Sequence, residues 1–98
     1  MDKNELAEIL AKHKQWLNNK EGGICANLFN ADLFKADLRN ADLDFSVWPL
    51  WCGSFDVKVD VRIARQIAYH FCRLECDDAE YKEAKKAVIA FAYKFHRV

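Results

Sequence analysis

The chain has 98 residues, of which 52% are hydrophobic and 13% aromatic, a composition that suits one small folded domain and argues against intrinsic disorder. Fifteen Lys and Arg balance fifteen Asp and Glu, which gives a net charge of zero. No apolar run approaches the roughly 20 residues of a membrane span, and the acidic N-terminus differs from a signal peptide. We therefore expect a cytoplasmic protein, whose four cysteines are reduced.

The first 20 residues predict a short amphipathic helix. Apolar positions recur at i, i+3, i+4 and i+7, Asp2 or Asn4 offers a cap, and "NNKEGG" ends the pattern. We interpret residues 1–20 as a helix that caps the open end of the segment that follows. His13 lies on the apolar face, where a packed histidine is favoured over a functional one because no partner is near in sequence.

Residues 26–45 read "ANLFNADLFKADLRNADLDF", in which Ala, then Asp or Asn, then Leu recur every five residues. On a helix, leucines spaced by five would spread around the cylinder, and in a continuous strand an odd repeat sends successive pairs to opposite faces. The chain must therefore turn once per pentad. The residues expected to point inward are Leu28, Leu33, Leu38 and Leu43, and those expected to face outward are Asn27, Asp32, Asp37 and Asp42.

This five-residue pattern resembles the pentapeptide-repeat family. The resemblance implies a right-handed quadrilateral β-helix with four pentads per coil, of which this chain has little more than one coil. After Trp48 the pattern breaks, and "GSFDVKVD" resumes as strict alternation of apolar and polar residues. We expect that stretch to be a strand that starts a second layer about 4.8 Å from the first.

The last 38 residues predict two helices. Asp60 is a cap for the first helix, and Asp77 or Asp78 is a cap for the second, whose basic C-terminus matches the helix dipole. The face expected to be buried on the first helix carries Ile63, Ala64, Ile67, Phe71 and Leu74.

The predicted fold class is therefore α+β. A single domain over residues 1–98 would consist of a cap helix (1–20), a short β-helix stub with its strand (24–60) and a C-terminal helical pair (61–98).

Enzyme chemistry finds little support in this sequence. There is no Gly-rich phosphate loop or nucleophile elbow, and the chain has only three His and three Gly. "HFCRLEC" places His70, Cys72 and Cys76 within seven residues, but only the two cysteines would share a helix face, whereas structural zinc needs four ligands. We expect no catalytic residue, no metal and no cofactor.

Charge is distributed unevenly along the chain. Residues 21–60 carry seven acids against three bases, and residues 61–98 carry eight bases against five acids. Turn formation alone would explain the repeated Asp, because Asp and Asn side chains bond their own backbone in turns. A nucleic-acid patch over residues 61–98 is a weaker interpretation, because acids interleave with the bases. A third interpretation is that the acidic segment competes with DNA for a basic groove.

The resemblance implies partners for an acidic surface. Some pentapeptide-repeat proteins resemble duplex DNA in width and charge and bind gyrase. The layout of this short chain, with its "SFDVKVD…AYHFC" segment, is similar to small phage and prophage proteins that include anti-CRISPR inhibitors of the type I-C surveillance complex, Cascade.

We therefore expect a non-catalytic, monomeric phage or prophage inhibitor in the host bacterial cytoplasm. It would act as a DNA mimic on a CRISPR Cascade subunit, without direct contact to nucleic acid or membrane. Gyrase or topoisomerase is the alternative partner, and a structural interaction module is the third possibility. The acids expected to contact the partner are Asp32, Asp37, Asp42, Asp44, Glu21 and Asp56.

Overall fold

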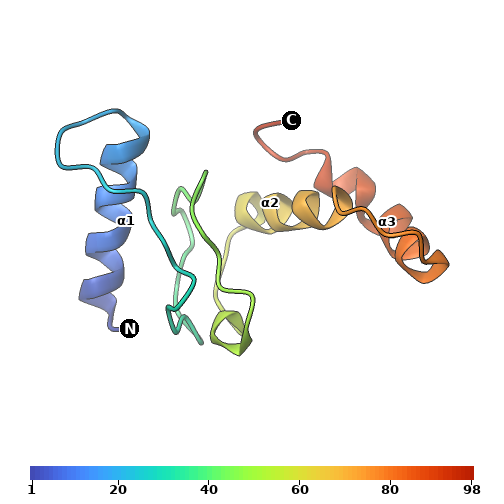
Figure 1. Cartoon of the computed structure of the whole chain (residues 1–98), viewed down its shortest axis with the longest axis horizontal. Coiled ribbons are helices and arrows are strands. Elements are labelled where there is room, and N and C mark those ends of the chain that lie inside the picture. The colour runs from blue at the N-terminus through green and yellow to red at the C-terminus, as the bar shows by residue number, and fades with distance from the viewer. The chain divides into compact units, whose positions relative to one another are not determined.

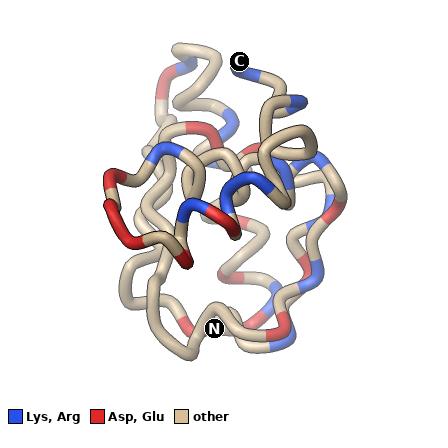
Figure 2. Tube along the Cα trace, turned by 90° about the vertical axis from the view of Figure 1, so that its right-hand side faces the viewer, with Lys and Arg blue, Asp and Glu red and all other residues tan.

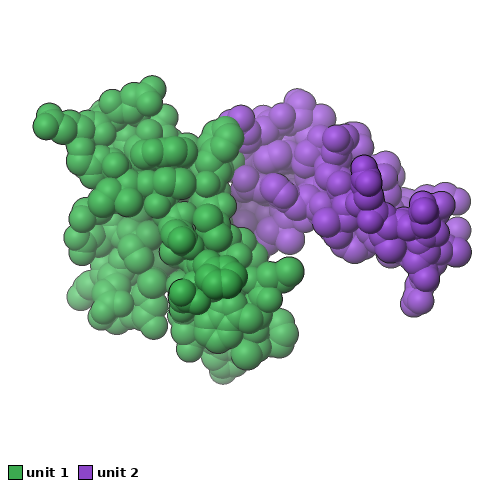
Figure 3. Space-filling model, in the orientation of Figure 1, with its two compact units in different colours: residues 1–58 green, residues 59–98 purple.

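The computed structural model describes residues 1–98 as three α-helices and a long run of tight turns between the first two (Figure 1). The chain divides into two units, residues 1–58 and residues 59–98 (Figure 3). This division falls close to residue 61, where the sequence predicted that the helical pair begins. None of the helices combines the length and the hydropathy that crossing a membrane would require.

The predicted N-terminal helix is confirmed as α1 (Lys3–Leu17). It begins at Asp2, whose side chain accepts a hydrogen bond from the Glu5 amide at 2.8 Å and so satisfies one of the free N–H groups of the first turn. It ends where Asn19 adopts the left-handed conformation, with φ of 55°.

His13 connects α1 to the turns that follow it, and its side chain is fully buried. The Ala26 backbone N–H donates to Nδ1 at 3.0 Å, so the ring proton is on Nε2, which donates to the Asp44 carbonyl at 2.8 Å. The imidazole therefore satisfies two backbone groups of the repeat segment that have no water available. The prediction of a packed histidine is confirmed.

Each pentad of residues 26–45 makes one tight turn. The carbonyl of each central Leu accepts a hydrogen bond from the backbone N–H three residues later, at N···O distances of 2.7 to 3.0 Å. The Asp or Asn before that Leu accepts, through its side chain, from the N–H two residues later at 3.0 to 3.2 Å. The left-handed conformation recurs with the same period, at Lys35, Asn40 and Phe45.

The inward direction of the repeat leucines is confirmed. Leu28, Leu33 and Leu38 have no exposed surface, and Leu43 is 6% exposed. Together with Leu6, Ala26 and Ala31 they form the core of residues 1–58.

The predicted β-helix is wrong, and with it the predicted α+β class. No β-strand forms, and helical residues make up 45% of the chain. Residues 47–58 run beside residues 26–38, but their pairing reduces to two isolated parallel bridges, Asn27 with Val47 and Asp37 with Lys58. A turn in every pentad leaves straight pieces that are too short for consecutive ladder bonds. The pentapeptide-repeat architecture that the resemblance implied is therefore not found.

The strand expected over "GSFDVKVD" is also absent. Residues Cys52–Ser54 form a short 3-10 turn, η1. Asp56 has φ of 57°, which interrupts the extended backbone that apolar and polar alternation would need. Local turn chemistry thus overrides the period-two pattern.

The C-terminal helical pair is confirmed as α2 (Val61–Cys72) and α3 (Ala79–Ala92), which pack against each other. Asp60 caps α2 and Asp78 caps α3, each by accepting a backbone N–H through its side chain. The predicted apolar face of α2 is only partly covered, since Ile67 is 45% exposed; Leu74, which was assigned to this face, lies after the end of the helix and is 58% exposed. The buried apolar side chains of this unit are Ile63, Cys72, Ala92 and Phe95.

The Tyr81 side chain of α3 caps the C-terminal end of α2. Its hydroxyl donates to the Phe71 carbonyl at 2.6 Å and also lies 3.2 Å from the Leu74 carbonyl, so α3 supplies a donor that the last turn of α2 lacks. Burial raises the pKa of Tyr81, and the thiols of Cys72 and Cys76 add to the effect.

Candidate protein-interaction surface

Large apolar side chains are exposed on the turns of residues 1–58. We call the four rings of Phe29, Phe34, Trp51 and Phe55, together with Leu50 next to Trp51, the aromatic surface. Their exposed fractions run from 43% for Trp51 to 95% for Leu50. In the first two pentads, Phe directly follows the buried Leu, at a position that each turn directs outward.

Backbone hydrogen bonds bring the two segments that carry these rings together. The Leu33 N–H donates to the Gly53 carbonyl at 2.7 Å, and the Lys35 N–H donates to the Phe55 carbonyl at 3.3 Å. Residues 29–35 and 51–55 therefore lie side by side, and their exposed rings belong to one region of the unit.

Trp51 is held in a defined orientation within this region. Its Nε1 donates to the Phe29 carbonyl at 3.0 Å. The indole lies over Gly53, where a Cβ would come within 2.5 Å of ring carbon Cζ2. Glycine at position 53 is thus required for this ring position, and the aromatic surface is partly pre-organised.

Charged groups adjoin the rings. Asp32 is exposed and its Oδ1 accepts from the Phe34 N–H at 3.1 Å, so its carboxylate is anchored two residues from that ring. Lys35 Nζ lies 5.3 Å from the centroid of the Phe34 ring. Asp56, also exposed, directly follows Phe55. The aromatic surface therefore carries carboxylates of the predicted set, with one ammonium beside them.

The other predicted acids have different surroundings. Arg39 donates to both carboxylate oxygens of Asp37, from Nε at 2.9 Å and from Nη2 at 2.7 Å. This pairing holds the pKa of Asp37 well below its usual range, and Lys58 adds to the effect. Asp37 is therefore ionised, but a cation of the same chain accompanies its charge.

Asp44 is only 8% exposed, and Asp42 is half-buried, with its Oδ1 accepting from the Asp44 N–H at 3.2 Å. Glu21 is exposed, and lies after α1 rather than on the repeat turns. Acidic and basic positions are interspersed along the chain (Figure 2). The structure thus brings Asp32 and Asp56 next to the aromatic surface and does not gather the six predicted acids into one patch.

The aromatic residues were missed in the sequence-based prediction of the site. The available signal was the outward position of Phe29 and Phe34, one residue after an inward Leu. Phe at a solvent-facing turn position is unusual, because burial of a ring is favourable and turns prefer small polar residues.

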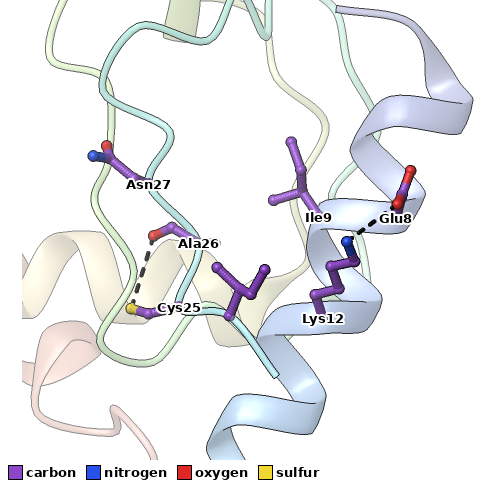
Figure 4. Close-up of a pocket in the computed structure, with 7 residues that line it drawn as sticks. Glu8, Ile9, Lys12, Cys25, Ala26 and Asn27 are labelled. Atoms are coloured by element: carbon purple, nitrogen blue, oxygen red, sulfur yellow. Dashed lines mark hydrogen bonds and ion pairs between the residues drawn. The ribbon is translucent and has the colours of Figure 1, made fainter. Parts of the chain in front are cut away.

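A pocket of about 330 Å³ lies between α1 and residues 24–27 (Figure 4). Its only ion pair joins Lys12 Nζ to Glu8 Oε1 at 3.3 Å, on the exposed side of the helix. The Cys25 thiol donates to the Phe45 carbonyl at 3.3 Å, so it is engaged in the turn. Ile9, Ile24 and Ala26 supply apolar walls of this pocket, and its other lining residues are Glu8, Lys12, Cys25 and Asn27.

The residues of "HFCRLEC" are separated by burial. Cys72 is buried, whereas His70 and Cys76 are exposed. No group of three or more His, Cys, Asp or Glu side chains is arranged to hold a metal ion.

Comparison with known proteins adds no relative: no family model, no curated protein and no solved structure matches this chain.

Proposed function

We propose that the protein is a non-catalytic phage or prophage inhibitor, which binds a type I CRISPR surveillance complex (Cascade) and prevents it from binding target DNA. The observation that supports the proposal is the aromatic surface with Asp32 and Asp56 beside it. The complex would offer a groove lined by Lys and Arg, into which these carboxylates fit as replacements for DNA phosphates.

Exposed rings favour a protein partner over a structural role. Contiguous apolar surface on a soluble protein marks an interaction site, and aromatic residues are enriched at the centres of interfaces. Phe34 and Phe55 are 52% and 60% exposed, so a partner would remove much ring surface from water. Guanidinium groups of a basic groove also stack favourably on such rings.

The choice of a CRISPR complex comes from the similarity in layout to small phage inhibitors, namely an N-terminal helix, a few pentads and the "SFDVKVD…AYHFC" segment. Competition with DNA comes from the charge of residues 1–58, in which nine acids stand against seven bases. Opposite charge speeds the encounter with a basic groove, and this effect weakens as salt rises because exposed charges are screened.

The test measures binding of labelled target duplex to purified Cascade in the presence of the inhibitor. The informative variant is Asp32→Asn/Asp37→Asn/Asp42→Asn, because Asn keeps the side-chain acceptor of each turn while removing the charge. We expect inhibition to weaken at least about tenfold, which corresponds to about 1.4 kcal/mol. Most of the loss should come from Asp32, because Arg39 already accompanies Asp37 and Asp42 is half-buried.

The matched control is Glu75→Gln/Asp77→Asn/Asp78→Asn, which removes three acids from residues 59–98 and keeps a capping side chain on α3. It should inhibit as well as the unchanged protein. Phe34→Ala and Phe55→Ala should each weaken inhibition by more than tenfold if the rings are anchors.

Full inhibition by the triple Asn variant would refute competition through charge. Absence of any effect on Cascade, together with inhibition of DNA supercoiling by gyrase, would move the proposal to the alternative partner.

A further inference from the structure

The helical unit, residues 59–98, carries a second surface that the proposed function does not use. On α2, Arg62, Arg65 and Tyr69 follow the i, i+3, i+7 spacing that places side chains on one helix face. The end of α3 and the residues after it contact the same side chains. Residues 62–69 and 91–97, which are far apart in the sequence, therefore form one site.

Three side-chain contacts define this site. Arg62 Nη2 lies 3.1 Å from His96 Nε2, and the Arg65 guanidinium carbon lies 5.5 Å from the centroid of the Phe91 ring. The Tyr69 and Tyr93 ring centroids are 5.3 Å apart.

Within residues 59–98, most of the acidic residues lie in one short segment. Residues 60–69 and 91–97 contain four bases, Arg62, Arg65, Lys94 and Arg97, and a single acid, Asp60, which caps α2. The other five acids of the unit all lie within residues 75–83. A basic patch was a weak interpretation of the sequence because acids interleave with the bases. Five of these acids lie outside residues 60–69 and 91–97.

Aromatic rings are available beside these bases. Phe91 is 38% exposed and Tyr93 is 43% exposed. Arg65 Nε is buried without a hydrogen-bond partner, and its guanidinium lies against the Phe91 ring, so any contact of Arg65 with a phosphate would come from the remaining N–H groups of the guanidinium. Rings that accept a stacked base, next to cations that accept a phosphate, are the combination by which proteins bind single strands.

We propose that this site, formed by Arg62, Arg65, Phe91, Tyr93, Lys94 and Arg97, binds single-stranded nucleic acid. The bases of an intact duplex are stacked on each other and do not reach the rings, so a single strand is favoured over a duplex. This inference stands whether or not the protein acts on Cascade.

Fluorescence anisotropy of the full-length chain with a labelled 12-nucleotide oligo(dT) tests the proposal. Binding should be detectable at low salt with Kd of about 10⁻⁴ to 10⁻⁶ M, as for other sequence-independent sites. If all four bases contact phosphates, log Kobs should fall with log salt at a slope of about −3, from about −0.7 per contact.

Arg62→Gln/Arg65→Gln should reduce that slope by about 1.4 and weaken binding at least tenfold. Tyr93→Ala should weaken binding by about fivefold or more and leave the slope unchanged, since it removes stacking alone. Lys82→Gln/Lys86→Gln is the matched control, because it removes the same charge from exposed lysines that lie near Asp77 and Glu83. Its affinity should stay within twofold of that of the unchanged protein.

A second readout uses the unchanged protein and does not depend on the stability of any variant. Photo-crosslinking with an oligonucleotide that contains 5-iodouracil should label the tryptic peptide 87–94, which carries Phe91 and Tyr93. Crosslinks confined to residues 1–58 would overturn the assignment. So would no binding at 100 μM protein, an equal loss in the lysine control, or equally tight binding of duplex DNA or polyphosphate.

Discussion

Replacing His13 by Phe tests whether one buried imidazole holds α1 against the repeat turns. Phe keeps a ring of similar size that can stack on Trp16, whose centroid is 5.7 Å from that of His13. It removes both hydrogen bonds, so the Ala26 N–H and the Asp44 carbonyl lose their partner. Ala26 is only 2% exposed, so water cannot easily replace the imidazole there.

The magnitude follows from the number of groups left unsatisfied. Each buried backbone group without a partner costs about 1–3 kcal/mol, so His13→Phe should lower the free energy of unfolding by about 2–6 kcal/mol. That is a large share of the roughly 5–15 kcal/mol typical of small proteins. At a slope of about 2 kcal/mol per M, the urea midpoint should fall by at least about 1 M.

Urea unfolding followed by tryptophan emission measures this loss of stability. The signal reports on residues 1–58, because Trp16, Trp48 and Trp51 all lie there. His13→Asn retains an acceptor near the position of Nδ1, and His13→Gln retains a donor near Nε2. Each should therefore fall between the unchanged protein and His13→Phe. A midpoint for His13→Phe within about 0.2 M of the unchanged value would show that the two hydrogen bonds do not contribute as described.

Three further changes give distinct signatures. Leu38→Ala should lower the free energy of unfolding by about 2–5 kcal/mol, because Leu38 has no exposed surface, and an exposed-site effect below about 0.5 kcal/mol in urea unfolding would contradict its place in the core. Gly53→Ala should displace the Trp51 indole, whose Cζ2 would lie 2.5 Å from the new Cβ, and an unchanged tryptophan emission maximum would argue against this packing. The pKa of Tyr81 is raised by burial, so its contribution to stability is complete below its ordinary pKa of about 10 and is lost as pH rises through the raised value. Tyr81→Phe should reduce this alkaline loss of helicity, measured by circular dichroism, and identical pH profiles would refute the assignment.

The helices were predictable because their signals are local. Asp2, Asp60 and Asp78 each precede an apolar periodic run, and each accepts a backbone N–H in the structure. Capping depends on neighbours within three residues, so it can be read without knowing the tertiary fold. Coverage of a helix face is not local, which is why Ile67 fits the periodicity and yet remains exposed, while Leu74 fits it but lies after the last residue of α2.

The repeat shows the same division between local and non-local information. An odd period implied one turn per pentad with Leu inward, and the turns and the burial of Leu28, Leu33 and Leu38 agree. A β-helix further requires consecutive pairing with a second layer. That pairing depends on residues 47–58, where the 3-10 turn and the left-handed Asp56 leave two isolated bridges.

The candidate sites were less predictable because they depend on which residues meet in space. Charge counted along the chain pointed to six acids, whereas pairing with Arg39 and the burial of Asp44 change what two of them present to a partner. Conversely, the interleaving of acids and bases after residue 60 concealed a cluster that forms only when the end of α3 contacts α2.

Asp in the repeat has two properties that the sequence alone cannot separate, namely its turn-forming oxygen and its charge. Asn27 makes the same side-chain bond, at 3.0 Å, that Asp32, Asp37 and Asp42 make at 3.1 to 3.2 Å. Turn formation therefore does not require a carboxylate at these positions. The charge of Asp37 is accounted for by Arg39, but no such intramolecular pair explains the choice of Asp over Asn at Asp32, which lies beside the exposed Phe34. A basic partner would explain it, and the Asn variants measure that contribution while the turn bonds are retained.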